Sequence, residues 1–308
     1  MTDSVVALSE QSIKQGSKSF AAAARIFDRE TRDDCVMLYA WCRHCDDVID
    51  GQTLGHDQQA DFRDGQLERL DALRRQTAEA LDNGNSDDPI FIALSRVAAR
   101  REIPTLHPHQ LLRGFEMDVE GRVYETVNDT LDYGYHVAGV VGVMMAMIMG
   151  ARDPAVLDRA SDLGIAFQLT NIARDVIDDA RGGRVYLPAE LLREQGLNSI
   201  DPDDRAQWPR LHAAALRLLE IAEPYYDSAI VGMSALPARS AWAIGAARRV
   251  YRAIGMQLRR GGPSAWEGRV STSKTQKIAL LFAGLGDAAA SRISVPAVPR
   301  AGLYQRPL

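Results

Sequence analysis

Apolar residues recur along most of this chain at intervals of three and four, the spacing that places them on one face of an α-helix. Strings of glycine, asparagine, aspartate and proline interrupt the pattern, as expected of helix ends and loops. No stretch alternates between apolar and polar residues for long enough to predict a strand. The pattern therefore predicts an all-α fold, with helices at about 31–49, 56–81, 89–102, 108–120, 137–150, 210–234, 237–260 and 273–287.

The most apolar of these predicted helices covers residues 137–150. Its 14 residues are fewer than the roughly 18 that a membrane-spanning helix requires, so the run indicates a buried helix. It contains Gly139 and Gly142, and glycine inside a helix costs about 0.5–1 kcal/mol relative to alanine. The two glycines therefore predict the close approach of either a neighbouring helix or a ligand.

The ends of the helices and of the chain carry their own signals. Thr31 and Asp34 resemble a capping box at the start of one helix, and Gly51 supplies its end. No linker divides the chain of 308 residues, so we expect one domain over 1–292 and a loose, proline-containing tail over 293–308. The N-terminus lacks the apolar core of a signal peptide, which indicates a cytoplasmic protein.

The composition is that of a soluble helical protein, with 46% hydrophobic and 25% charged residues. The net charge of −5 argues against a nucleic-acid-binding protein, which normally has a concentrated basic face. Cys35, Cys42 and Cys45 fall within one predicted helix, which favours reduced cysteines that serve packing. Zinc is the alternative because His44 is adjacent, but no second pair of cysteine or histidine ligands follows.

Acidic residues form two clusters with helical spacing. Asn171, Asp175 and Asp179 lie four apart and share one helix face, with Arg174 and Asp178 close beside them. Crowded carboxylates repel and raise one another's pKa, so such a patch indicates a bound cation or a positively charged partner.

The second cluster lies in the predicted helix at 31–49 and its last turn. Tyr39, Arg43, Asp46 and Asp50 follow intervals of four, three and four, which makes one stripe too polar for ordinary core. Mg²⁺ prefers carboxylate and water oxygens, and it commonly binds through one or two carboxylates together with substrate phosphates. Two acidic helices that face each other therefore predict magnesium and a phosphorylated substrate.

Other polar groups allow more than one interpretation. Ser17, Lys18 and Ser19 combine hydroxyls with a cation, although a plain turn explains them equally well. Glu116 and Asp118 fit a solvated helix face. The basic residues of the predicted helix at 237–260 fit either a solvated face or a phosphate contact; they are Arg248, Arg249, Arg252, Arg259 and Arg260.

Together these motifs resemble the trans-isoprenoid synthases of the squalene and phytoene synthase family, with the bacterial phytoene-forming branch as the nearest. The first aspartate motif of the family matches DDVID at 46–50, preceded by Tyr39 and Arg43, and the second matches NIARD at 171–175. The match continues through Asp179 to RVYLP at 184–188. SKSF at 17–20 and the glycine-containing segment from Tyr135 also match.

The resemblance implies a single helical bundle around a deep apolar cavity, with the two aspartate motifs facing each other across its mouth. It implies that two geranylgeranyl diphosphates condense head to head through a cyclopropyl (prephytoene) diphosphate to phytoene, with release of diphosphate, in carotenoid biosynthesis. The expected cofactor is Mg²⁺, with Mn²⁺ as a substitute, and phytoene formation needs no NADPH. Because substrate and product are lipids, peripheral contact with a membrane is compatible with this activity.

The resemblance and the chemistry of the residues together assign the candidate site. The expected metal ligands are Asp46, Asp50, Asn171, Asp175 and Asp179. Catalytic roles are expected for these four aspartates and for Tyr39, Arg43, Tyr133 and Arg174. Substrate contacts are expected from Ser17, Lys18, Ser19, Arg43, Gly139, Gly142, Asn171, Arg174, Arg184 and Tyr186. Leucine in place of Gly142 is expected to hinder a C20 donor more than a C15 donor, with little change in stability.

Three other functions compete with this one. A dehydrosqualene or squalene synthase would use C15 farnesyl diphosphate, and squalene formation would add NADPH. A cyclising terpene synthase or a chain-elongating prenyltransferase also uses two acidic motifs, but SKSF and the segment from NIARD to RVYLP disfavour it. A helical protein that binds partners without catalysis would leave the acidic clusters as solvated faces, which does not explain why acidic and apolar features occupy the same helices.

Overall fold

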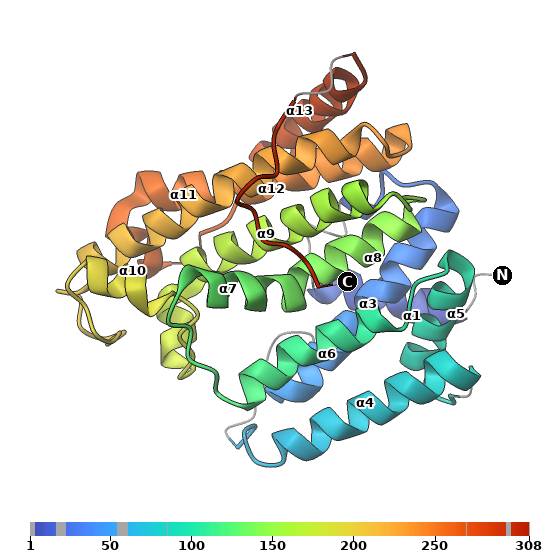
Figure 1. The fold of residues 1–308 in the computed structure, drawn as a ribbon, viewed down its shortest axis with the longest axis horizontal. Helices are drawn as coiled ribbons and strands as arrows, with labels where there is room; N and C mark the ends of the chain where they lie inside the picture. Colours follow the sequence, from blue (N-terminus) through green and yellow to red (C-terminus); the bar gives the residue numbers. More distant parts are fainter. Residues whose placement is uncertain are drawn as a thin grey trace.

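The computed structural model describes residues 4–16, 23–53, 61–84, 86–268, 270–293 and 297–307, and this part of the chain forms a bundle of helices (Figure 1). The longest helix, α9, runs through the middle, packed against α11 and α12 on one side and against α8 on the other. The helices are α1 (Ser4–Gly16), α3 (Arg29–Asp50), α4 (Gln66–Asn83), α5 (Pro89–Arg101), α6 (Leu106–Val119), α7 (Val127–Gly134), the π-helical η1 (Tyr135–Gly139), α8 (Val140–Ile148), α9 (Pro154–Arg181), α10 (Ala189–Glu194), α11 (Trp208–Met233), α12 (Ala238–Gly261), the 3₁₀-helical η2 (Gly262–Glu267) and α13 (Lys274–Ile293).

Helix α3, which carries the first acidic cluster, is delimited by local chemistry. The Asp28 carboxylate accepts hydrogen bonds from the Thr31 backbone N–H at 3.0 Å and from the Thr31 hydroxyl at 2.8 Å, and so caps the helix. Gly51 ends it in the left-handed conformation, as expected, with φ of 59°. The predicted capping box is wrong, because Asp34 is buried and instead accepts a hydrogen bond from Arg101 at 2.6 Å.

The apolar helix predicted at 137–150 begins ten residues earlier. Thr126 and Asp129 form a capping box at the start of α7, and the helical run then continues through η1 and α8. This run, Val127–Ile148, is the one stretch among the described residues that is long and apolar enough to cross a membrane. Because 72% of its most apolar window is buried against other helices, it has the environment of a core helix.

The crossing of α8 over α9 is unusually close because both helices carry glycine there. A Cβ atom on Gly164 would lie 2.2 Å from the carbonyl oxygen of Ala138. A Cβ atom on Gly142 would lie 2.4 Å from the carbonyl oxygen of Ala160, well inside van der Waals contact. The two backbones therefore touch directly, and side chains larger than hydrogen do not fit between them.

The C-terminal segment departs from the sequence expectation. Residues 297–307 were expected to form a loose tail, but they lie against α7, α9 and α11; they are the dark red trace in Figure 1. Arg300, Tyr304 and Arg306 hydrogen-bond to acidic groups on α7 and α9. The prolines prevent a helix here, but the side chains between them still anchor the segment.

Candidate active site

A cavity of about 970 Å³ lies among α3, α6, α8, α9 and α12. Its lining changes in character along α9. Asn171, Asp175 and Asp179 line it near the end of that helix, whereas Leu163 and Phe167 line it further back. Successive residues of a helix rise by about 1.5 Å, so the cavity has a polar end and a long apolar remainder.

Helix α3 presents its acidic cluster to the polar end. Asp46 accepts a hydrogen bond from Arg43 at 2.5 Å, and Asp50 accepts one from Arg184 at 2.6 Å. Burial raises the pKa of Asp46 to about 7, and the nearby carboxylate of Asp50 adds to the shift. The Arg43 guanidinium lies 6.0 Å from the centre of the Tyr39 ring.

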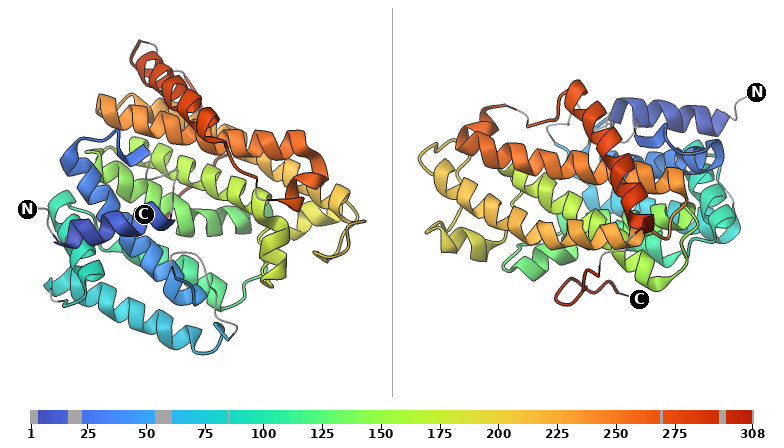
Figure 2. Two further views of the ribbon diagram at one scale, coloured as in Figure 1. Left: turned by 180° about the vertical axis from the view of Figure 1, so that it is seen from behind. Right: turned by 90° about the horizontal axis from the view of Figure 1, so that it is seen from above.

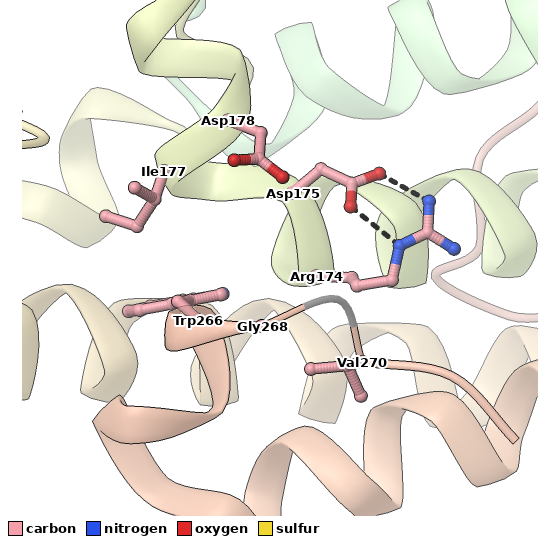
Figure 3. A pocket seen from close by; sticks show the side chains of 7 residues that line it. All are labelled: Arg174, Asp175, Ile177, Asp178, Trp266, Gly268 and Val270. Atoms are coloured by element: carbon pink, nitrogen blue, oxygen red, sulfur yellow. Dashed lines mark hydrogen bonds and ion pairs between the residues drawn. The ribbon is translucent and has the colours of Figure 1, made fainter.

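Helix α9 supplies the second cluster (Figure 3). Arg174 donates two hydrogen bonds to the Asp175 carboxylate, that from Nε measuring 2.7 Å. Burial, and next the charge of Asp175, raise the pKa of Asp179 to about 8. The Asn171 Oδ1 atom is buried and has no hydrogen-bond partner within the described residues. Asp178, by contrast, is 74% exposed and lies outside the cavity.

These oxygen atoms suit a hard cation. Burial and mutual repulsion raise the pKa of these carboxylates and so disfavour their charged form. A cation beside them favours the charged form again. The Asn171 oxygen, which has no hydrogen-bond partner in the described part of the chain, is a further oxygen ligand of the type that binds Mg²⁺. No three acidic, histidine or cysteine side chains of the described residues already converge on one point. Asp46, Asp50 and Asp175 are instead each hydrogen-bonded to an arginine.

Asp118 belongs to the same polar end, although the sequence suggested a solvated face for it. Its carboxylate accepts hydrogen bonds from the Tyr186 hydroxyl at 2.9 Å and the Tyr133 hydroxyl at 3.1 Å. The two rings stack with centres 4.8 Å apart. Burial raises the pKa of Asp118 to about 6. The signal that could have revealed it is its spacing of three from Phe115 and seven from Leu111, both of which line the cavity.

Helices α12 and α13 add two residues that sequence reasoning missed. Tyr251 lines the cavity and stacks on Phe167 with ring centres 4.0 Å apart, and Lys277 brings a cation to the lining. The neighbouring arginines of α12 serve the fold. Arg249 pairs with Asp287 of α13 at 2.6 Å, and Arg252 donates to a glutamate of α11. A phosphate contact is therefore the wrong interpretation for these two arginines.

The remaining expected substrate contacts have different outcomes. Arg184, Tyr186 and Tyr133 line the cavity. Gly139 does not line it, because it faces α9, where an added Cβ atom would lie 3.0 Å from the Ser161 hydroxyl. Gly142 borders the cavity but also touches α9, so the expectation that leucine would fit there without loss of stability is wrong. Ser17, Lys18 and Ser19 lie outside the described residues.

Comparisons with known proteins point to one family. The model of the squalene/phytoene synthase family matches residues 13–276. The chain is 54% identical over 303 residues to a 15-cis-phytoene synthase of Paracoccus sp., covering 98% of both chains. It is 51% identical over 296 residues to that of Enterobacter agglomerans, covering 95% of this chain and 99% of the relative. The structure resembles that of a dehydrosqualene synthase with a bound ligand, with a TM-score of 0.81, 27% identity, and coverage of 93% of this chain and 97% of the other.

Proposed function

Because the chain belongs to the squalene/phytoene synthase family, we propose that it condenses two geranylgeranyl diphosphates head to head to phytoene in carotenoid biosynthesis. The enzyme is a prenyltransferase. One observation carries the proposal: a single cavity joins two acidic helices to a long apolar channel. The relatives that align over nearly their whole length are named phytoene synthases, which favours C20 donors over the C15 donors of dehydrosqualene or squalene synthases.

The polar end of the cavity suits the ionisation of an allylic diphosphate. We propose that Asp46, Asp50, Asn171, Asp175 and Asp179 hold Mg²⁺, for which Mn²⁺ can substitute. When bound, the ion neutralises the negative charge that grows on the departing diphosphate. A guanidinium matches diphosphate oxygens in the bidentate way in which Arg174 now binds Asp175, so the arginines paired with these carboxylates can change partner when substrate enters.

The rest of the cavity suits the carbon chains and the carbocation. Burial of each CH₂ group contributes about 0.8 kcal/mol, so long prenyl tails bind well along the apolar lining. The stacked rings of Tyr133 and Tyr186 line the cavity beside Asp118, and aromatic faces attract cations. Each of the two steps of the reaction releases one diphosphate and one proton, so phytoene forms without a reductant.

Purified protein supplied with C20 diphosphate and Mg²⁺ is expected to yield a C40 hydrocarbon at the same rate with and without NADPH. C15 diphosphate is the matched alternative substrate and is expected to react more slowly, because it buries one isoprene unit fewer. Chelation of divalent cations should stop the reaction, and added Mg²⁺ or Mn²⁺ should restore it.

Product chain length and the need for NADPH, both measured by chromatography, decide between the functions. A C30 product formed faster from C15 diphosphate would identify a dehydrosqualene or squalene synthase instead. Full turnover after exhaustive chelation would show that the reaction needs no divalent cation.

We also propose that the protein contacts membranes peripherally through α13. Ile278, Phe282 and Leu285 follow intervals of four and three on one face of that helix and are 57%, 64% and 45% exposed. Other residues of the same helix, Lys277 and Leu281, line the cavity. The exposed face therefore lies next to the space that holds lipid substrates, and the exposed Lys274 in the first turn suits anionic headgroups.

Phe282→Ser is expected to reduce flotation of the protein with vesicles of anionic phospholipid several-fold, because it removes the largest exposed apolar side chain of this face. Leu67→Ser is the matched control, since Leu67 is also 64% exposed but lies on α4, away from α13 (Figure 1). Equal flotation of the two variants would contradict membrane contact through α13.

A further inference from the structure

The C-terminal segment, residues 297–307, supplies the ion-pair partner of a carboxylate that is buried inside the bundle. Asp162 of α9 is 0% exposed, and both of its carboxylate oxygens accept hydrogen bonds from the Arg300 guanidinium at 2.9 Å. The Ser228 hydroxyl of α11 donates a further hydrogen bond to it. Burying a carboxylate is costly unless it is paired and hydrogen-bonded. Arg300, from a segment far along the chain, therefore compensates a charge between two central helices.

Further contacts tie the same segment to three helices. The Tyr304 hydroxyl donates to Asp132 of α7 at 2.7 Å, and its backbone N–H donates to the Tyr225 hydroxyl of α11 at 3.0 Å. The Arg306 guanidinium donates to Asp158 of α9 at 2.6 Å. Figure 2, viewed from above, shows the segment running along the outside of the bundle to the C-terminus. It thus links α7, α9 and α11 at once.

Another contact of the same segment involves a residue that lines the cavity. Arg159 lines the cavity, and its guanidinium donates to the Val298 carbonyl at 2.9 Å and to the Ser228 hydroxyl at 3.0 Å. Its stem packs against α11 at Gly232, where an added Cβ atom would lie 2.8 Å from the Arg159 Cβ atom. The Val298 carbonyl therefore fixes the guanidinium of a residue that lines the cavity.

Arg159 lies at the end of the cavity away from the acidic clusters. At about 1.5 Å per residue, it is about 24 Å along the α9 axis from Asp175. A C20 chain with its diphosphate at the acidic end extends one isoprene unit further towards Arg159 than a C15 chain does. Changes to this far wall therefore affect the longer donor more.

We propose that residues 297–306 position the far wall of the cavity, through Asp162 and Arg159, and so determine the preference for C20 over C15 donors. The segment acts on chain length without touching the diphosphate. This inference rests on the proposed condensation of prenyl diphosphates.

The test is a competition assay in which the two donors, carrying different radioactive labels, share one tube with the full-length enzyme. The ratio of the labels in the hydrocarbon product does not depend on how much of the enzyme is folded. Arg300→Gln is expected to lower the C20-to-C15 ratio about tenfold, within the range by which small changes in an apolar pocket alter selectivity. Arg205→Gln is the matched control, because Arg205 pairs with Glu267 at 2.6 Å on the surface, and its ratio should equal that of the wild type.

Tyr304→Phe is the second variant, in case Arg300→Gln yields no folded protein. It removes only the hydroxyl bonded to Asp132 and should lower the ratio in the same direction by a smaller factor. An unchanged ratio in the folded variants, or an equal fall in Arg205→Gln, overturns the positioning role. A wild-type enzyme that makes no hydrocarbon from C20 diphosphate would instead overturn the proposed function, so the two failures are distinguishable.

Discussion

Asp175→Asn is expected to lower turnover by about 100-fold or more, since even groups that only support a metal ligand contribute about 10–100-fold. Asparagine has nearly the same shape as aspartate, and the carboxylate of Asp175 is bonded to its sequence neighbour Arg174. The substitution therefore removes a charge that we propose faces the cation, without removing a contact between helices. We expect the midpoint of thermal unfolding to stay close to that of the wild type.

The matched control is Asp178→Asn, three residues further along the same helix. The Asp178 side chain is 74% exposed and lies 3.7 Å from Arg181, so the variant should keep near wild-type activity. Turnover of C20 diphosphate is measured for both variants over a range of Mg²⁺ concentrations. If Asp175→Asn turned over substrate as fast as the wild type at low Mg²⁺, Asp175 would not be a metal ligand.

Gly142→Ala is expected to lower the free energy of unfolding by about 2 kcal/mol or more, the usual scale for overpacking a well-packed contact. Alanine favours a helix over glycine by about 0.5–1 kcal/mol, so helix propensity alone predicts the opposite sign. The new Cβ atom would meet the Ala160 carbonyl oxygen at 2.4 Å, and this is main chain that moves only if α9 moves.

Gly286→Ala on α13 provides the control for helix propensity. A Cβ atom there has no neighbour within 4 Å, so alanine should leave the protein unchanged or slightly more stable. Both variants are compared by denaturant unfolding. If Gly142→Ala unfolds like the wild type but loses activity only towards C20 diphosphate, Gly142 serves the cavity wall and the packing role is wrong.

The acidic clusters illustrate what the sequence predicts well. The interval of four that joins Asp46 to Asp50, and Asp175 to Asp179, is a property of a single helix, because 3.6 residues complete each turn. The first stretch was predicted as a helix at 31–49, within two residues of the observed α3, whereas for the second only the part around Asn171–Asp179 was predicted and the observed α9 begins earlier, at Pro154. The resemblance to a family then indicated that the two helices face one cavity.

Gly142 shows where prediction from the sequence stops short. Its position in an apolar helix left a ligand contact and a helix contact equally open, and both agree with the cost of glycine in a helix. The two contacts are distinguished only by how close Gly142 lies to Ala160 and Gly164 of α9. No pattern among neighbouring residues of the sequence predicts that distance.

The sequence by itself determined the all-α class and the two acidic helix faces, because these depend on residues within a turn or two of one another. Only the tertiary structure decided that Asp118 is a buried partner of two tyrosines and that Arg300 anchors the C-terminal segment on Asp162. The physical reason is that an acidic or basic side chain is stable either in water or in a buried pair. Which of the two occurs depends on the distant segment that covers it.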